Sequence, residues 1–147
     1  MPMTMSSQLN GHFFEDLAVG QEAHRSNLVT ERCIEAFADV SGDKNPVHLD
    51  ADYAAGTRFK ERIAHGMLSA GYISAVVGMD LPGPGAIYVS QTLNFKAPVK
   101  IGDTVVATVR IVELMPKRRV KFATVCTVNG KPVVEGEAVM MVPARPT

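Results

Sequence analysis

The sequence predicts an α+β domain in which a curved antiparallel sheet encloses one apolar helix. Helical patterns occupy the first half of the chain, and consecutive β-branched runs bounded by turn residues occupy the second half. Helices followed by a series of strands are typical of this class. Between them lies a segment that is apolar on nearly all sides. Such a helix needs cover from every direction, which a strongly bent sheet provides.

Length and composition narrow the functional classes. The 147 residues suit a single domain, with a flexible tail expected over residues 1–12 and the domain over residues 13–147. Fifteen basic residues balance fifteen acidic ones, which argues against nucleic acid or an anionic membrane as partner. The longest charge-free apolar run, residues 66–79, is too short for a membrane span. Two cysteines and an N-terminus without a signal-peptide pattern favour a reducing cytoplasm.

The first elements are one strand and three helical segments. A strand is expected over Glu22–Leu28. Thr30 is a suitable N-cap for a helix that ends near Gly42, because apolar residues then share one face. A short turn over Asp50–Ala55 comes next, and the apolar helix follows over residues 63–78.

Four strands complete the domain after a turn at residues 82–85. The strongest hairpin indication is Asn129-Gly130, because these residues readily adopt the two positive φ angles of a type I′ turn. Another turn is expected at residues 101–103. The expected strands are Ala86–Lys96, Thr104–Met115, Arg119–Val128 and Pro132–Val142.

The densest polar cluster, residues 41–50, contains a candidate acid–base pair. Pro46 forces Asn45 out of the α region, so we expect a loop that can bend Asp43 and His48 toward one point. A carboxylate and an imidazole sharing one water can exchange protons near neutral pH. In the alternative interpretation, Asp43 and Asn45 cap a turn and His48 is a packed polar residue. The spacing alone favours that alternative.

A second candidate feature lies at the start of the apolar helix, at His65-Gly66. Free N–H groups and the positive end of the helix dipole point outward there. Glycine allows a ligand oxygen to approach the backbone, so the Gly66 N–H is a candidate oxyanion-hole donor. Alternatively, Gly66 only eases packing and His65 caps the helix. The sequence supports both interpretations equally.

Two long motifs carry a resemblance to a known family. They are Phe37-Ala38-x-x-Ser41-Gly42-Asp43-x-Asn45-Pro46-x-His48-x-Asp50 and Ile63-x-His65-Gly66-Met67-Leu68. In this order and separation they resemble the MaoC-like hydratases, the (R)-specific enoyl-CoA hydratases. The similarity extends from Phe14 to Pro143. It implies the hot-dog fold, an antiparallel sheet wrapped around a long central helix, and a homodimer with active sites near the subunit interface.

The resemblance also implies a reaction and its residues. Asp43 and His48 become the catalytic pair, the Gly66 N–H the oxyanion donor, Asn45 a support of the loop, and Ser74 a residue bordering the acyl pocket. Water held by the pair adds to Cβ of a trans-2-enoyl-CoA, giving the (R)-3-hydroxyacyl-CoA reversibly. No cofactor or metal is required. Such hydratases serve fatty acid metabolism and polyhydroxyalkanoate precursor supply.

Four alternatives stay open at this stage. An acyl-CoA thioesterase of the same fold usually has an acid on the central helix, which this helix lacks. A 3-hydroxyacyl-acyl-carrier-protein dehydratase would act on a different carrier, and the balanced charge favours coenzyme A. A non-catalytic acyl-binding protein would not need the acid–base pair. A metal site from Asp43, His48 and His65 lacks a short-spaced ligand motif.

Overall fold

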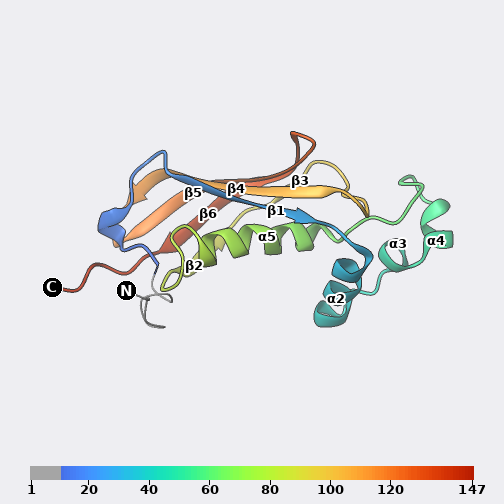
Figure 1. The fold of residues 1–147 in the computed structure, drawn as a ribbon, viewed down its shortest axis with the longest axis horizontal. Coiled ribbons are helices and arrows are strands. Elements are labelled where there is room, and N and C mark those ends of the chain that lie inside the picture. Colours follow the sequence, from blue (N-terminus) through green and yellow to red (C-terminus); the bar gives the residue numbers. More distant parts are fainter. Residues whose placement is uncertain (1–10) are drawn as a thin grey trace, which may run out of the picture.

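The computed structural model of the chain describes residues 11–147, which form a six-stranded antiparallel sheet lying over a long helix, α5 (Figure 1). Residues 1–10 of the predicted tail lie outside the described residues. The N–H groups of Gly11 and His12 donate to the Pro84 and Pro82 carbonyls. The helices are η1 (Phe14–Asp16), α2 (Glu31–Ser41), α3 (Pro46–Leu49), α4 (Ala51–Ala55) and α5 (Gly66–Met79). The strands are β1 (Glu22–Leu28), β2 (Ile87–Gln91), β3 (Asn94–Phe95), β4 (Thr104–Met115), β5 (Arg119–Val128) and β6 (Lys131–Met141).

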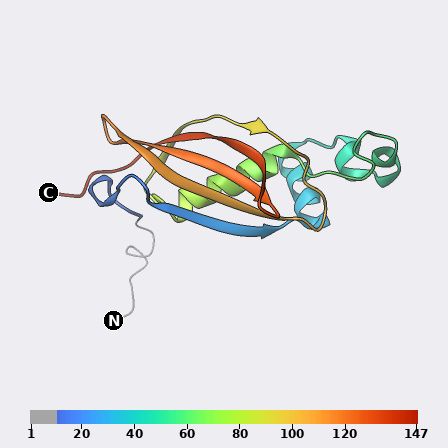
Figure 2. The same ribbon diagram turned by 90° about the horizontal axis from the view of Figure 1, so that it is seen from above.

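The three long strands β4, β5 and β6 form the centre of the sheet. The order is β1-β4-β5-β6-β2, and β3 also pairs with β6. Figure 2 shows α5 running beneath this sheet, with β1 along one edge. The predicted type I′ turn between β5 and β6 is confirmed, because Asn129 and Gly130 have φ angles of 52° and 78°.

The strand predicted over Ala86–Lys96 is wrong as one element, because the chain breaks between β2 and β3. The Thr92 carbonyl crosses β6 so closely that a Cβ on Gly136 would lie 1.8 Å from its oxygen. The Thr92 N–H donates to Glu137, and its hydroxyl accepts from the Glu137 N–H. These contacts replace regular pairing, so β2 and β3 meet β6 at separate places.

One face of α5 packs into the core and the opposite face is open. The sheet covers a face whose side chains recur every three or four residues: Ser69, Ile73, Val76 and Val77. Gly71 and Ser74 lie on the exposed side. The sheet of one chain therefore covers only part of the helix that was expected to be wrapped. No helix within residues 11–147 is long and apolar enough to cross a membrane.

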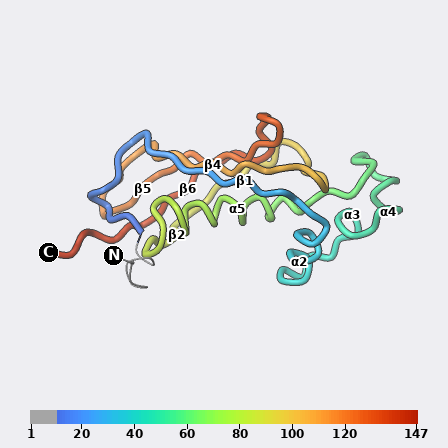
Figure 3. Tube along the Cα trace, viewed as in Figure 1, coloured from blue at the N-terminus to red at the C-terminus, as the bar shows by residue number. Residues whose placement is uncertain are grey.

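Helices α2, α3 and α4 lie together at the end of the molecule opposite the C-terminus (Figure 3). The prediction that residues 41–50 form only a loop is wrong in part. Asn45 does leave the α region, with φ −55° and ψ 129°, but Pro46 then begins α3. Proline is well suited to the first helical position because its missing N–H would have no partner there.

Candidate active site

Asp43 lies in a tight connection between α2 and α3. Gly42 ends α2 in the left-handed conformation, with φ 80°. The Asp43 N–H donates to the Ser41 hydroxyl, and the Asp43 carboxylate accepts from the Asn45 N–H at 3.2 Å. Asn45 in turn caps α3 by accepting from the Val47 N–H. Asn45 therefore supports the loop from both sides, while Asp43 stays exposed to solvent.

His48 is held in one tautomer by a backbone carbonyl. Its Nδ1 lies 2.8 Å from the Ile63 oxygen. A carbonyl only accepts hydrogen bonds, so Nδ1 carries the proton and Nε2 has a free lone pair. The residue is nearly buried, with 9% of its surface exposed. His48 is therefore oriented as a proton acceptor at Nε2.

The Asp43 carboxylate and the His48 ring face the same small space. One nitrogen or oxygen atom from each of Asp43, His48 and His65 lies within 4.8 Å of the others. Two hydrogen bonds of about 2.8 Å, meeting at one water, span up to roughly 5.6 Å. One water can therefore touch both members of the pair. The structure brings together Asp43 and His48, which the sequence spacing alone did not require.

One atom from each of these three side chains lies close enough for a metal cluster, but the ring geometry disfavours a shared ion. The His48 and His65 rings are stacked, with centroids 3.8 Å apart and planes at 29°. Imidazole lone pairs lie in the ring plane, so stacked rings do not direct them at one ion about 2 Å from each nitrogen. Moreover, His48 Nδ1 and His65 Nε2 are already bonded to carbonyls. This geometry fits a water better than a metal.

Gly66 begins α5 beside these residues. Within residues 11–147 its N–H donates to no backbone or side-chain acceptor. A Cβ on Gly66 would lie 2.6 Å from a ring carbon of Phe95, so the ring occupies the space that a side chain would need. The absent side chain leaves the N–H open beside a flat apolar wall. This is the arrangement that an oxyanion-hole donor requires.

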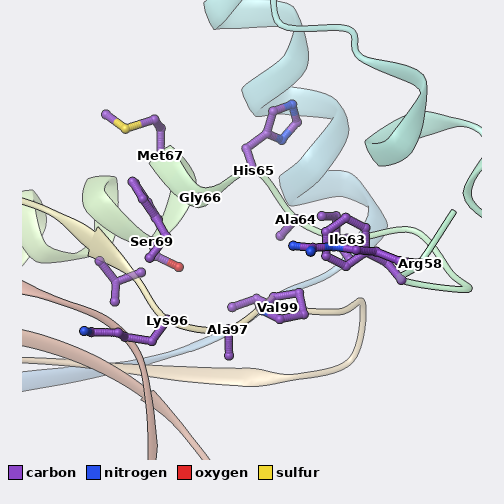
Figure 4. A pocket seen from close by; sticks show the side chains of 14 residues that line it. Arg58, Ile63, Ala64, His65, Gly66, Met67, Ser69, Lys96, Ala97 and Val99 are labelled. Atoms are coloured by element: carbon purple, nitrogen blue, oxygen red, sulfur yellow. The ribbon is translucent and has the colours of Figure 1, made fainter.

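A cavity of about 420 Å³ opens at Gly66. Figure 4 shows Gly66 and Met67 at one side, the segment of Lys96, Ala97 and Val99 at the other, and Arg58 beside Ile63, at the far end from Lys96. Ser69 also lines the cavity, whereas Ser74 does not. Ser74 instead lies on the exposed side of α5, on the same helical stripe as Gly71 and Gly78. An added Cβ at either glycine would meet no atom within 4 Å.

Arg62 and Phe95 take part in the site although the sequence analysis did not select them. Arg62 Nε donates to the His48 carbonyl at 2.7 Å, and its guanidinium also pairs with Glu31 at 2.7 Å. It thereby ties α2, α3 and the segment leading to α5. These contacts join residues 14 and 31 positions apart, so no local pattern indicates them. In the sequence, the role of Arg62 is indicated solely by its position directly before the motif that begins at Ile63.

The buried thiol near the cavity is not a nucleophile. Cys126 lies beneath α5, with Sγ 3.5 Å from the Ser69 carbonyl. Burial raises the pKa of Cys126 to about 12, so the thiol stays protonated at neutral pH. Cys33 has a lowered pKa because Thr30 hydrogen-bonds to its sulfur, but it lies at the start of α2. Acid–base chemistry at Asp43 and His48 is what the arrangement offers.

Comparison with known proteins gives consistent matches. Residues 16–136 match the family described as MaoC like domain. The chain is 60% identical to an (R)-specific enoyl-CoA hydratase of Rhodospirillum rubrum, across 91% of this chain and 94% of that protein. It is 47% identical to a 3-hydroxybutyryl-CoA dehydratase of Methylorubrum extorquens, across 96% and 90%. An unliganded R-hydratase structure from Pseudomonas aeruginosa superposes with a TM-score of 0.88, at 51% identity, across 92% and 88%.

Replacing Gly66 by alanine tests its contact with Phe95. We expect Gly66→Ala to lower the free energy of unfolding by about 1 kcal/mol, the low end of the cost of overpacking, because the exposed Phe95 ring can move aside. In a Phe95→Ala background the same change should cost almost nothing, because the obstructing ring is gone. Denaturant unfolding of the two single variants and the double variant measures the coupling. Equal costs in both backgrounds would contradict the contact.

Proposed function

This chain belongs to the MaoC-like domain family and is a hydro-lyase, and we propose that it acts through Asp43, His48 and the Gly66 N–H. The reaction is the reversible (R)-specific hydration of a trans-2-enoyl-CoA to the (R)-3-hydroxyacyl-CoA. A relative named for this hydration and another named for a 3-hydroxybutyryl-CoA dehydration match most of the chain. Hydration and dehydration are the two directions of one reaction. The fold is the hot-dog fold, in agreement with the sequence prediction.

The first step is the addition of water. His48 Nε2 accepts one proton from the water while Asp43 accepts the hydrogen bond of the other, so the oxygen is oriented and activated together. The oxygen bonds to Cβ, and the π electrons of the double bond move toward the thioester. The proton is then returned by the same pair to Cα on the same face. Overall, one water molecule is added across the double bond, and no other reactant is consumed.

Negative charge accumulates on the thioester oxygen during this step, and the Gly66 N–H stabilises it. The donor stands at the N-terminus of α5, where the helix dipole favours negative charge. The apolar Phe95 ring stands beside it and offers no competing hydrogen-bond partner, so the N–H is left to the thioester oxygen. Because the thioester itself delocalises the charge, the three groups need no cofactor.

The observation that carries this proposal is the arrangement of Asp43 and His48 beside the N-terminus of α5. His48 has a fixed tautomer, Asp43 lies within one water of it, and a free N–H follows on the adjacent helix. A thioesterase base on the central helix has no counterpart, because residues 66–79 contain no acid. Asp80, directly after α5, is engaged by Arg25 at 2.6 Å.

Coenzyme A is the carrier that the cavity favours. Arg58 and Lys96 line the cavity from opposite sides, so two cations stand where a charged carrier would enter. Their charges match the phosphates of coenzyme A. Both cysteines of the chain are unpaired thiols, which fits an enzyme of the cytoplasm.

The open face of α5 supports a homodimer. Met67 and Met79 are exposed on this helix by 54% and 60%, and Gly71 and Ser74 lie between them. A helix that is apolar all round is normally buried. A second copy of the chain would cover this face and close the site from the other side. No partner of another kind, nucleic acid or membrane, is needed to explain it.

The acyl chain extends along this same face, past Ser74. From the thioester at Gly66, residue 74 stands eight positions further on, about 12 Å along the helix axis. Gly71 and Gly78 flank it without side chains and have free space beside them, so a groove would form between the helix and the proposed partner. Short acyl groups end before Ser74, and longer ones reach it.

The pair is tested by assay with crotonyl-CoA. We expect loss of enoyl absorbance without release of free thiol. Asp43→Asn and His48→Ala should each lower turnover by about two to four orders of magnitude, because each removes an acid–base group. Asp39→Asn and His24→Ala serve as matched controls, since both residues are exposed and lie outside the site. Released thiol, or near-normal activity of both site variants, would contradict the proposal.

The groove is tested by Ser74→Leu. We expect a larger loss of kcat/KM for long enoyl-CoA than for crotonyl-CoA, because added carbons obstruct only chains that reach residue 74. Filling a pocket typically costs about 1–3 kcal/mol, roughly 5–150-fold in rate. Ser26→Leu makes the same change at an exposed position of β1 and is the control. An equal loss at all lengths together with a lower melting temperature would remove Ser74 from the groove.

The assembly is tested by light scattering. We expect a mass of twice 15.8 kDa at micromolar concentration, because an uncovered apolar helix face favours association. Gly78→Glu, which places a charge on that face, should shift the protein toward the monomer. A monomeric wild-type protein at working concentration would refute the homodimer.

A further inference from the structure

His65 contacts both members of the proposed catalytic pair, although the mechanism gives it no step. Its Nε2 lies 2.9 Å from the Asp43 carbonyl, and its ring is stacked on the His48 ring at 3.8 Å. It is also the residue directly before Gly66 and stands at the N-cap of α5. Only 2% of its surface is exposed. One buried side chain thus adjoins the acid, the base and the oxyanion donor.

The hydrogen bond to Asp43 fixes the state of the ring. A carbonyl can only accept, so Nε2 carries the proton and Nδ1 is an unprotonated acceptor. Nδ1 is buried and has no hydrogen-bond partner within residues 11–147. In the alternative interpretation His65 caps the helix; it does occupy the N-cap position, but its side chain makes no capping hydrogen bond. Among residues 11–147, the polar contact that the His65 side chain does make is therefore directed to the loop that carries Asp43.

The flat faces of the ring are also occupied. One packs on His48, and Phe37 of α2 lies against His65 with centroids 4.7 Å apart at 52°. In Figure 4 the His65 ring points away from Lys96, Ala97 and Val99, toward the helices that carry the pair. The His65 ring therefore packs against the residues that hold the catalytic pair in place.

We infer that His65 is a positioning residue that sets the distance between Asp43 and His48. The Nε2–H holds the Asp43 backbone, and the ring face holds the imidazole of His48. A histidine is required because it combines a planar stacking surface with an in-plane donor. Glutamine supplies the donor without the ring, and phenylalanine supplies the ring without the donor. Because misplacement by about 1 Å can cost 100-fold in rate, the effect should appear in kcat.

The experiment compares three variants of the full-length protein with crotonyl-CoA as substrate; it rests on the proposed function. His65→Gln keeps a donor at the reach of Nε2, whereas the shorter His65→Asn does not. We expect the kcat of His65→Asn and His65→Phe to fall about 10–100-fold, with KM changed less than about threefold. The kcat of His65→Gln should be at least about fivefold higher than that of His65→Asn. If His65→Phe does not fold, the comparison of His65→Gln with His65→Asn still tests whether the donor of His65 is required.

A double-variant cycle tests whether His65 acts through Asp43. In an Asp43→Asn background, His65→Asn should change the residual rate less than about threefold, because the group it positions is already disabled. The full single-variant loss in that background would overturn the inference. A His65→Asn variant with near-normal kcat would also overturn the inference. The same holds if His65→Asn and His65→Gln lose kcat to the same extent.

Two controls separate positioning from general loss of structure. Binding of butyryl-CoA, which has no double bond to hydrate, should stay within about threefold of wild type in the His65 variants. Ile73→Val lowers stability from within α5 without touching the pair and should keep kcat. If weak butyryl-CoA binding accompanies the loss of kcat, His65 is merely structural and the inference is overturned. If the wild-type protein itself does not hydrate crotonyl-CoA, the proposed function fails and the inference fails with it.

Discussion

The proposed chemistry depends on two backbone carbonyls that select which nitrogen of each neutral imidazole carries the proton. Ile63 accepts from His48 Nδ1, and Asp43 accepts from His65 Nε2. Histidine can carry its proton on either nitrogen, and only a fixed partner selects one. Ile63 also forms an isolated β-bridge with Lys100, which lies shortly before β4, so the carbonyl that orients His48 is anchored to the segment leading into the sheet. A mobile loop could not provide this.

The fold separates an apolar core from a polar cluster at one end, which suits the need to hold two imidazoles in fixed orientations. The sheet and the inner face of α5 supply the buried core, in which almost every side chain is apolar. The polar cluster is confined to the place where α2, α3 and the start of α5 meet. There the backbone groups at helix ends have few partners of their own, so side chains and carbonyls can pair across elements. Arg62 links the three segments with a charge that stays only slightly exposed.

Local patterns predicted most elements, while contacts across the chain decided the rest. The Asn129-Gly130 turn and the β1, β4 and β5 bounds were predictable because alternation and turn residues are local properties. The break after β2 was not, since it arises where Thr92 crosses Gly136. Local patterns offered Asp43, His48 and Gly66 only as candidates with alternative interpretations, and the family resemblance decided between these without indicating the geometry. The His48–His65 stack depends on how α3 meets α5, and no spacing in the sequence encodes it.

In the proposed homodimer, the open face of α5 links the amount of protein in solution to its stability. If a second copy covers that face, the folded chain and the assembled pair share one free energy, and mass action governs both. Dilution then favours the separate chain, whose exposed methionines face water. Thermal midpoints and rates per chain would both vary with concentration. A cell could therefore tune this activity through abundance alone, more steeply than in proportion to the number of chains.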